Sequence, residues 1–387
     1  MVFDTVLTVV LVALLFLSFH SYVLYPLIMR VIASFQKEVK GAKSIPTVSI
    51  LISAYNEEKV IRARVANIAA QNYELKKIEL LIGSDNSKDD TNRILAELEK
   101  EYSWLKIFLF PQRRGKASVL NDLIAVAQNE IVVFTDANTQ FDVNALPILL
   151  ERFGEEQIGG VCGRLVLRET SETKLAGIEE KKYWQYETSI KKSEGKCGVL
   201  IGANGGIFAV RRELLDALPA DSITDDLYIS LSVLMKGRKF VYQDRAVATE
   251  DITSDLATEF KRKVRFAATN FRTVLYCTSL LVDRNILLAF AFWSHKILRW
   301  VFPLILILMF ITNLLLLDAS TLFIVLFRAQ LILYGIGVAG YVLSAFKIRI
   351  TVFSVVYFFM ISNIALLVGF LKFIRGKGSP IWQSTPR

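Results

Sequence analysis

The sequence predicts an α/β domain, with a mostly parallel sheet and flanking helices, that is set between helical transmembrane segments at both ends of the chain. Two observations carry this prediction. Over residues 47–135, short runs of apolar and β-branched residues alternate four times with helical segments, which is typical of a parallel sheet covered on both faces. Outside residues 37–284 the chain is dominated by long uncharged apolar runs, and the mean hydropathy of the whole chain is +0.41.

The first apolar run covers residues 5–29 and contains no charged side chain, so it is long enough to span a bilayer. Basic residues follow it at Arg30, Lys37, Lys40 and Lys43, which by the positive-inside rule puts the N-terminus outside and residue 30 onward in the cytoplasm. We therefore expect three parts: an N-terminal transmembrane helix (1–36), a cytoplasmic domain (37–283) and a C-terminal membrane part (284–387).

Strands and helices follow in order inside the predicted domain. Four strands are expected, at residues 47–53, 78–83, 106–110 and 131–135. One helix is expected to start at 56–58 and to run to about residue 70, a second to start at Asp89, and two more to cover residues 117–128 and 225–236.

Two of these strands end in acids, at Asp85 and at Asp136, and a basic cluster at 113–116 lies between them in the sequence. In open α/β sheets ligands bind beyond the carboxyl ends of the strands. Acidic side chains that can hold a metal, next to basic side chains that can bind phosphates, indicate a nucleotide-diphosphate site at this edge of the sheet. Lys116 is a candidate phosphate ligand. The alternative is that Asp136 only caps the following turn. The sequence has neither a P-loop nor a GxGxxG fingerprint.

The composition excludes several other classes of site. The net charge of +9 comes without a nucleic-acid recognition motif, so we attribute it to anionic lipids and substrates, and we expect no nucleic-acid partner. The three cysteines lack metal-ligand spacing. Because the two histidines, His20 and His295, both lie in the apolar flanks, a general base in the cytoplasmic domain is expected to be a carboxylate.

The C-terminal part is expected to begin with an interfacial helix at 285–294, anchored by His295, Lys296, Arg299 and Trp300. Runs at 300–317, 329–346 and 350–371 are predicted spans, with 318–328 as an outer hairpin, which gives four spans in all. This count leaves the basic tail from Lys372 to Arg387 outside, against the positive-inside rule. Either the tail is an exception or one of the runs is re-entrant or interfacial.

Seven motifs occur in a fixed order between residues 45 and 275: SAYNEE (53–58), SDNSKDDT (84–91), RGKA (114–117), TDANT (135–139), GANGGIFAVRR (202–212), ITDDLYISLSVLMKG (223–237) and RKVRF (262–266). Together they resemble the membrane-bound family 2 glycosyltransferases of the GT-A fold, a family that includes bacterial polysaccharide synthases. The resemblance implies a cytoplasmic-face enzyme of the inner membrane, with several spans, that uses a nucleotide sugar.

The resemblance also implies roles for individual residues. Nucleotide-sugar contacts fall on Tyr55, Glu57, Asp85, Asp136, Arg262 and Arg265. Asp136 corresponds to the first acid of the DxD metal motif, and Asn138 stands where the second acid is usual, which leaves an amide oxygen in place of a carboxylate. We expect Mg²⁺ or Mn²⁺ as the cofactor.

The catalytic base is expected to be Asp226, with Asp225 beside it, because they match the T-E/D-D motif. Gly202, Asn204, Gly205 and Phe266 are candidate contacts of the acceptor or of the donor sugar, and Phe266 replaces the usual Trp. Each role has a structural alternative: Thr224 as an N-cap whose acids complement the helix dipole, Arg262 and Arg265 on a solvated helix face, and the GANGG segment as a flexible loop. Trp184 and Glu187 are assigned either to the acceptor or to interfacial packing.

The expected activity is inverting transfer from a nucleotide-diphosphate sugar, with a UDP-sugar favoured, to a growing polysaccharide or a lipid-linked glycan. One alternative is transfer of a single sugar to a membrane lipid such as polyprenyl phosphate. Another is a non-catalytic partner that binds a nucleotide within a glycan assembly complex.

Overall fold

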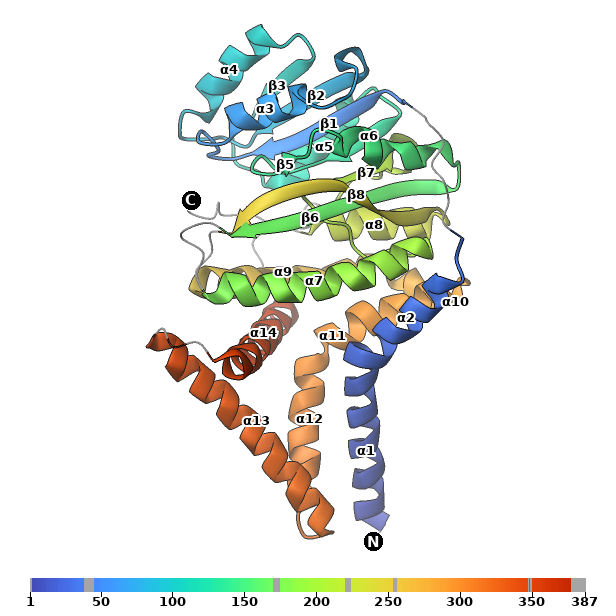
Figure 1. Cartoon of the computed structure of the whole chain (residues 1–387), viewed down its shortest axis with the longest axis vertical. Helices are drawn as coiled ribbons and strands as arrows, with labels where there is room; N and C mark the ends of the chain where they lie inside the picture. The colour runs from blue at the N-terminus through green and yellow to red at the C-terminus, as the bar shows by residue number, and fades with distance from the viewer. Residues whose placement is uncertain are drawn as a thin grey trace.

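The computed structural model describes residues 2–37, 45–169, 175–219, 224–252, 256–346, 348 and 350–376. Within these ranges an eight-stranded sheet with flanking helices lies above long apolar helices (Figure 1). The strands are β1 (Val48–Ala54), β2 (Ile78–Ser84), β3 (Leu105–Leu109), β4 (Ile131–Phe134), β5 (Gln140–Phe141), β6 (Ile158–Glu169), β7 (Phe208–Arg211) and β8 (Lys239–Ile252).

The strand order is β3-β2-β1-β4-β7-β6-β8-β5. Strands β1 to β4 pair in parallel, β7 pairs antiparallel with β4 and β6, and β6 returns to parallel pairing with β8. The predicted α/β fold with a mostly parallel sheet is confirmed.

Both faces of the sheet are covered, as the apolar character of β1 predicts. Ile50 and Ile52 point into the core shared with α3, α4 and α6, whereas Leu51 between them points into the core shared with α5 and α8. The helices of this part are α3 (Ile61–Ala69), α4 (Thr91–Glu101), α5 (Lys116–Val126), α6 (Ala145–Leu150) and α8 (Asp225–Met235), with short 3₁₀ turns at Leu75–Lys77, Glu151–Gly154 and Arg212–Leu214.

The first helix begins later than its acids suggest. Residues 56–60 form a turn in which Asn56 has a φ of +56°, and α3 starts at Ile61. The Asn56 backbone N–H donates to Ser87 Oγ, and its side-chain oxygen accepts from the Lys88 N–H at 2.8 Å. The turn after β1 is therefore tied to the loop after β2, which brings two predicted motifs together at one sheet edge.

Two long helices lie between the sheet and the apolar helices, α7 (Leu175–Lys196) and α9 (Leu256–Tyr276) (Figure 1). Helix α7 packs on β8 and on α2 (Tyr25–Ser34), and α9 packs along α14 (Thr351–Ile374). This layer joins the sheet to the apolar part.

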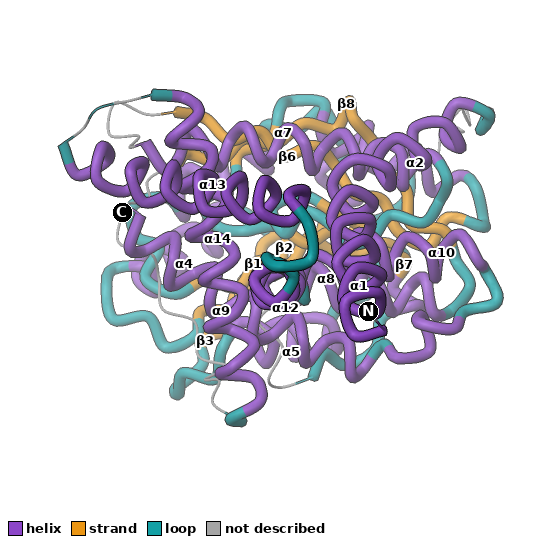
Figure 2. The backbone as a smooth tube through the Cα atoms, turned by 90° about the horizontal axis from the view of Figure 1, so that it is seen from below, coloured by secondary structure: helices purple, strands orange, loops and turns teal. Residues whose placement is uncertain are grey.

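Among the described residues, three helices are long and apolar enough to cross a membrane: Val2–Ser34, Thr321–Ala345 (α13) and Thr351–Ile374. The first consists of α1 (Val2–Phe19), a π-helical turn η1 (His20–Leu24) and α2. A fourth span arises if the pair Ile286–Trp300 and Phe302–Leu315, bent by 64°, is counted as one. Seen from below, α1 and α12 (Phe302–Leu315) run side by side (Figure 2).

The C-terminal part departs from the prediction in two places. At residues 286–300, α10 (Ile286–Ala291), the π-helical turn η6 (Phe292–Ile297) and α11 (Leu298–Trp300) follow a 3₁₀ turn at Thr278–Val282. The segment is therefore helical as predicted, and its interfacial position stays a prediction, whereas two of its predicted anchors are not at the surface. His295 and Arg299 are buried by ion pairs, so they are not surface anchors. The 318–328 hairpin is shorter than predicted, because α13 already begins at Thr321 and contains Arg328.

The predicted tail residues Lys377 and Arg387 lie outside the described residues, as do Lys40 and Lys43. The predicted domain boundaries also stay predictions.

Candidate active site

The predicted acids meet at one place. Lys116 Nζ lies 2.8 Å from Asp136 Oδ1 and 3.3 Å from Asp225 Oδ2. A Cβ placed on Gly205 would lie 3.5 Å from Asp226 Oδ2 and 3.8 Å from Asp136 Oδ2, so this glycine lies against both acids. The structure thus brings Asp136, Asp225, Asp226, Lys116 and Gly205 together.

Each member of this acid cluster comes from the end of an element. Asp136 follows β4, Lys116 opens α5, and Asp225 and Asp226 open α8. The end of β4 is fixed by Thr135, whose hydroxyl donates to the Gly206 carbonyl at 2.7 Å and accepts from the fully buried Arg64 at 2.8 Å. These bonds hold the end of β4 and the 202–206 loop against one another. Arg64 was not singled out by the sequence, because a lone arginine on a helix carries no motif.

Asp85 holds the basic loop in place. Its two carboxylate oxygens accept from the backbone N–H groups of Arg114 and Gly115, each at 2.8 Å, and the residue is 3% exposed. Asp85 therefore fixes the start of α5 and with it the position of Lys116. The Arg113 guanidinium lies 3.6 Å from the centroid of the Tyr55 ring, so the predicted nucleotide residue Tyr55 packs against the same basic loop. Glu57, a further predicted nucleotide residue, is buried beside it and its N–H donates to Thr91.

The electrostatics of the acid cluster favour a bound cation and a proton acceptor. Burial raises the pKa of Asp225 to about 6, with Lys116 opposing the shift and Asp226 adding to it. The pKa of Asp226 is raised in the same direction, also by burial. Burial lowers the pKa of Lys116, but the carboxylates of Asp136 and Asp225 outweigh burial, so that the pKa of this lysine is raised. A raised carboxyl pKa is what a general base that works near neutral pH requires.

Asp225 and Asp226 differ in exposure. Asp225 is 5% exposed, whereas Asp226 is half-buried and its Oδ1 accepts from the Leu227 N–H at 2.8 Å. The Thr224 side chain makes no capping bond to the helix, and its hydroxyl oxygen is buried without a partner in the described part of the chain. The alternative in which Thr224 caps α8 therefore lacks the hydrogen bond that a capping side chain makes to the helix. Because Asp226 is more exposed than Asp225, it is the acid of this pair that a substrate can reach.

The GANGG segment is an ordered loop. Asn204 is 2% exposed, and its amide donates to the Gly163 carbonyl at 2.8 Å and accepts from Lys191 at 2.6 Å. Both polar atoms of the Asn204 side chain are therefore hydrogen-bonded within the fold. Gly202 has a φ of +87°, a backbone conformation that favours glycine, and Gly205 lies against the acids, so Gly205 is the glycine of this loop that lines the site.

The donors around Asp136 fit a hard divalent cation, because carboxylate and amide oxygens are such a cation's usual ligands. The Asn138 amide nitrogen donates to Glu250 Oε1 at 2.8 Å, which leaves its oxygen as the atom for a metal. No group of three or more His, Cys, Asp or Glu side chains among the described residues holds a metal alone. A cation bound here would rely on substrate phosphates for part of its coordination shell. Glu250 on β8 was missed, since nothing local marks it.

The remaining predicted residues form a group of their own on α9. Arg262 pairs with Glu259 at 2.8 Å, and the guanidinium groups of Arg262 and Arg265 lie 5.9 and 5.4 Å from the centroid of the Phe266 ring. Burial and the neighbouring Arg262 lower the pKa of Arg265. The buried Nε atom of Arg265 lacks a partner among the described residues, which suits a site for an anion.

A buried ionic network joins α7 to the apolar part, and no local motif marks it. His295 Nδ1 lies 2.6 Å from Glu194 Oε1, His295 Nε2 lies 2.9 Å from Glu187 Oε2, and Arg299 donates to Glu187. Although burial opposes it, His295 and Arg299 hold the pKa of Glu187 well below its usual range. Glu187 thus has a structural role here, and Trp184 donates to the Leu165 carbonyl at 3.0 Å.

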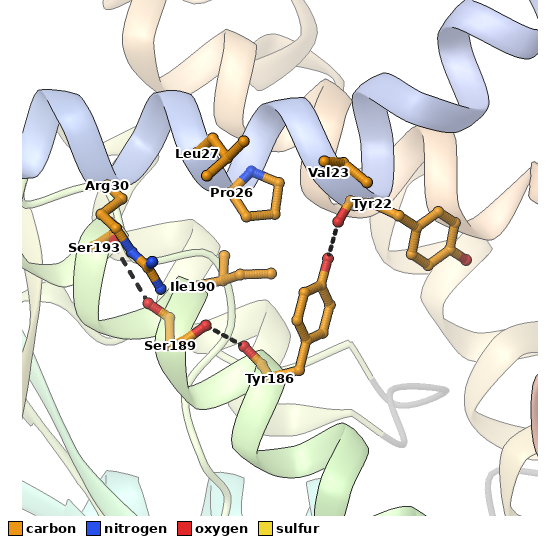
Figure 3. A pocket seen from close by; sticks show the side chains of 9 residues that line it. All are labelled: Tyr22, Val23, Pro26, Leu27, Arg30, Tyr186, Ser189, Ile190 and Ser193. Carbon is orange, nitrogen blue, oxygen red and sulfur yellow. Dashed lines mark hydrogen bonds between the residues drawn. The ribbon is translucent and has the colours of Figure 1, made fainter. Parts of the chain in front are cut away.

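The structure also has a groove of about 230 Å³ between α2 and α7. Its lining side chains come from η1, α2 and α7, with Val23 of η1 and Pro26 and Leu27 of α2 opposite Ile190 and Tyr186 of α7, as Figure 3 shows. The Tyr186 hydroxyl donates to the Tyr22 carbonyl at 2.7 Å. None of the predicted site residues lines this groove, so it is distinct from the acid cluster.

Comparisons with known proteins agree with this geometry. Residues 49–218 match the family model Glycosyl transferase family 2. The chain is 34% identical over 203 residues to a beta-monoglucosyldiacylglycerol synthase of Nostoc sp., covering 50% of this chain and 42% of the relative. It is 27% identical over 225 residues to a poly-beta-1,6-N-acetyl-D-glucosamine synthase of Staphylococcus aureus, covering 57% of this chain and 53% of the relative. The chain thus spans about half the length of these relatives.

Among solved structures, a mannosyltransferase from Pyrobaculum calidifontis in complex with GDP-Man and Mn²⁺ is similar with a TM-score of 0.73 and 20% identity. The similarity covers 96% of this chain and 99% of that one, so it includes the apolar helices as well as the sheet. At this identity the match establishes the GT-A-type fold alone.

Proposed function

We propose that this chain, in which residues 49–218 match the family model Glycosyl transferase family 2, transfers a sugar, with inversion, from a nucleotide-diphosphate sugar to a glycan or lipid-linked acceptor at a membrane. The observation that carries this proposal is the acid cluster, in which Lys116 pairs with Asp136 and Asp225 and in which Gly205 lies against Asp136 and Asp226.

The chemistry needs one base and a place for the leaving group. Asp226 takes the proton of the acceptor hydroxyl, and Asp225, whose pKa is raised by burial, tunes it. Asp136 and the oxygen of Asn138 would hold a Mg²⁺ or Mn²⁺ ion, which when bound stabilises the negative charge of the leaving diphosphate. Tyr55, with Arg113 over its ring, receives the nucleoside.

Asp85 orients the start of α5, so that Lys116 and the α5 N-terminus face the phosphates. The arginines of α9, Arg262 and Arg265, are assigned to the diphosphate on the family resemblance and on the unpartnered Nε of Arg265. We assign Gly202, Gly205 and Phe266 to the sugar and acceptor side.

For localisation we propose a cytoplasmic catalytic domain on a multi-pass membrane anchor. The candidate span Val2–Ser34 supports this, because α1 exposes apolar side chains such as Val9, Val12 and Phe16, and Arg30 and Lys37 follow at its far end.

A panel of nucleotide sugars, supplied with Mg²⁺ or Mn²⁺ and scored by product mass, tests the proposal. The wild-type chain should give one glycosylated product, and chelation should stop its formation. The Asp226→Asn variant should form no product but bind the nucleotide sugar as the wild type does. Wild-type turnover by Asp226→Asn would remove Asp226 from the base role, and the absence of any product from the wild type would favour the non-catalytic alternative.

A further inference from the structure

The segment after β4 that is assigned to the metal carries a single carboxylate. Asp136 and Asn138 are half-buried, whereas Ala137 between them is 3% exposed, so the two polar side chains leave the chain on the same side. Asp136 already pairs with Lys116 at 2.8 Å. An amide oxygen carries no formal charge, so this segment offers a divalent cation one carboxylate that is shared with an ammonium.

Glu250 brings a second carboxylate to this place from a distant part of the chain. Strand β5 pairs antiparallel with β8, with Gln140 opposite Thr249, and this register places Glu250 beside the residues that precede β5. Glu250 Oε1 accepts a hydrogen bond from Asn138 Nδ2 at 2.8 Å. On its other side β8 pairs with β6, where Glu250 lies opposite Leu167, so the backbone of Glu250 is held by the sheet.

The contact with Glu250 sets the orientation of the Asn138 amide. A primary amide can turn either its NH₂ group or its oxygen toward a neighbour, whereas an ionised carboxylate only accepts hydrogen bonds. The NH₂ group is therefore the end that faces Glu250, because the reversed amide would set its oxygen against a carboxylate oxygen. The Asn138 oxygen then lies at the end of the amide away from Glu250, and it is the atom that suits a hard cation.

Glu250 acts on the metal site through Asn138. Its Oε1 is engaged by the amide, and in the described part of the chain no three His, Cys, Asp or Glu side chains gather closely enough to hold a metal. Glu250 is therefore the neighbour of a metal ligand and not one of a ring of acids around the ion. Residues of this kind fix the orientation of a ligand, and their loss typically costs about ten- to a hundredfold in metal affinity.

We propose that Glu250 is a positioning residue of the metal site, which orients the Asn138 oxygen for the cation and contributes the negative charge that the second acid of a DxD motif would carry. This inference rests on the proposed function and deepens it, because it assigns part of the metal affinity to a residue outside every motif of the sequence. The alternative is that the bond only ties the segment after β4 to β8, in which case the charge of Glu250 has no effect on metal binding.

The test measures Mn²⁺ binding and does not depend on turnover. Mn²⁺ is titrated into the full chain in detergent with UDP and, separately, with GDP, and the loss of the electron paramagnetic resonance signal of free Mn²⁺ gives the affinity. Glu250→Gln removes the charge but keeps an oxygen that can accept from Asn138. The double variant Asn138→Asp/Glu250→Gln returns the charge to the motif and keeps a hydrogen bond between the two side chains. Glu151→Gln is the matched control, since Glu151 accepts from the amide of Gln243, also on β8, at 2.7 Å.

We expect Glu250→Gln to weaken Mn²⁺ binding by about tenfold or more. The double variant should bind Mn²⁺ at least as tightly as the wild type, because the carboxylate then belongs to the metal ligand itself. Glu151→Gln should bind Mn²⁺ as the wild type does. In chelator the melting temperatures of Glu250→Gln and of the wild type should agree, which assigns the loss of affinity to the site and not to unfolding.

The inference is wrong if Glu250→Gln binds Mn²⁺ like the wild type, if the double variant binds it no better than Glu250→Gln, or if the wild type binds no Mn²⁺ with either nucleotide. A failure of the proposed function would appear instead as absent sugar transfer in the nucleotide-sugar panel by a chain that binds Mn²⁺.

Discussion

The ammonium of Lys116 lies 2.8 Å from Asp136 Oδ1, the oxygen of the acid assigned to the metal. The same ammonium is 3.3 Å from Asp225 Oδ2, so one lysine pairs with both acids that frame the site. A divalent cation at Asp136 and the Lys116 ammonium therefore compete for the same carboxylate.

Replacing Lys116 by methionine should make stability depend on metal. Without the ammonium, the carboxylates of Asp136 and Asp225 repel one another, so the melting temperature should fall in chelator. Mn²⁺ should raise it more in Lys116→Met than in the wild type, because binding to the native state alone stabilises it. Thermal unfolding with and without Mn²⁺ measures this. Lys106→Met, which breaks an exposed pair with Glu79, is the control and should show no added response. Equal Mn²⁺ shifts in all three proteins would contradict the competition.

The rate of transfer should fall as the pH drops below about 6, because burial raises the pKa of Asp225 to about 6 and this carboxyl takes up a proton there. The pKa of Asp226 is raised in the same direction, also by burial. Asp225→Asn removes a negative charge next to Asp226, which should lower the pKa of Asp226 and move this fall to lower pH. The profile of kcat/KM against pH measures both effects, and an unshifted profile would show that the two acids titrate independently.

The same shift has a consequence for stability. The folded-state pKa of Asp225, about 6, exceeds the ordinary value of 3.8. The stabilising contribution of this carboxyl is therefore present below pH 3.8 and is lost as the pH rises through about 6.

A methyl group at position 205 should impair catalysis but not folding. In Gly205→Ala the added Cβ would lie 3.5 Å from Asp226 Oδ2, which is an ordinary contact, yet it would fill space between the two acids. We expect kcat to fall by about tenfold or more and the free energy of unfolding to change by less than about 1 kcal/mol. Gly335→Ala on α13, where an added Cβ meets nothing within 4 Å, is the control. Unchanged kcat in Gly205→Ala would show that this space is not used.

Breaking the buried network from one side should destabilise the whole chain. Arg299→Met leaves Glu187 buried with one counter-ion fewer, and such a loss costs about 3–5 kcal/mol. The double variant with Glu187→Gln should recover much of this loss, because removing both partners leaves no uncompensated charge. Denaturant unfolding of the full chain in micelles measures both. A double variant no better than the single one would show that the loss comes from packing.

The parts of the site that sequence reasoning found are those marked by local pattern. Asp136 stands out because a buried strand ends abruptly before it, and Asp226 because it opens a helix. That these two acids share Gly205 as a neighbour depends on the pairing of β4 with β7, which connects residues about 75 positions apart and leaves no local mark.

Asn204 and His295 illustrate what a sequence pattern does not reveal. Asn204 belongs to a motif assigned to the sugar, yet its amide bonds to Gly163 and Lys191 inside the fold. His295 lies in an apolar run that predicts a surface helix, but its two partners on α7 are 101 and 108 residues away. Side-chain pairings over such separations follow from the tertiary fold and not from periodicity.

The network around Glu194 has a practical outcome for anyone who wishes to study the catalytic half in solution. Tyr25 from α2 donates to Glu194 at 2.5 Å, and His295 and Arg299 come from beyond residue 284. A fragment of residues 45–284 would lose all three partners. The carboxylates of Glu187 and Glu194 on α7 would then lack their counter-ions, and the apolar surface around them would be exposed to water. We expect such a fragment to aggregate when expressed, because the helices at both ends of the chain are needed to cover this face of α7 and to keep the catalytic domain folded and soluble.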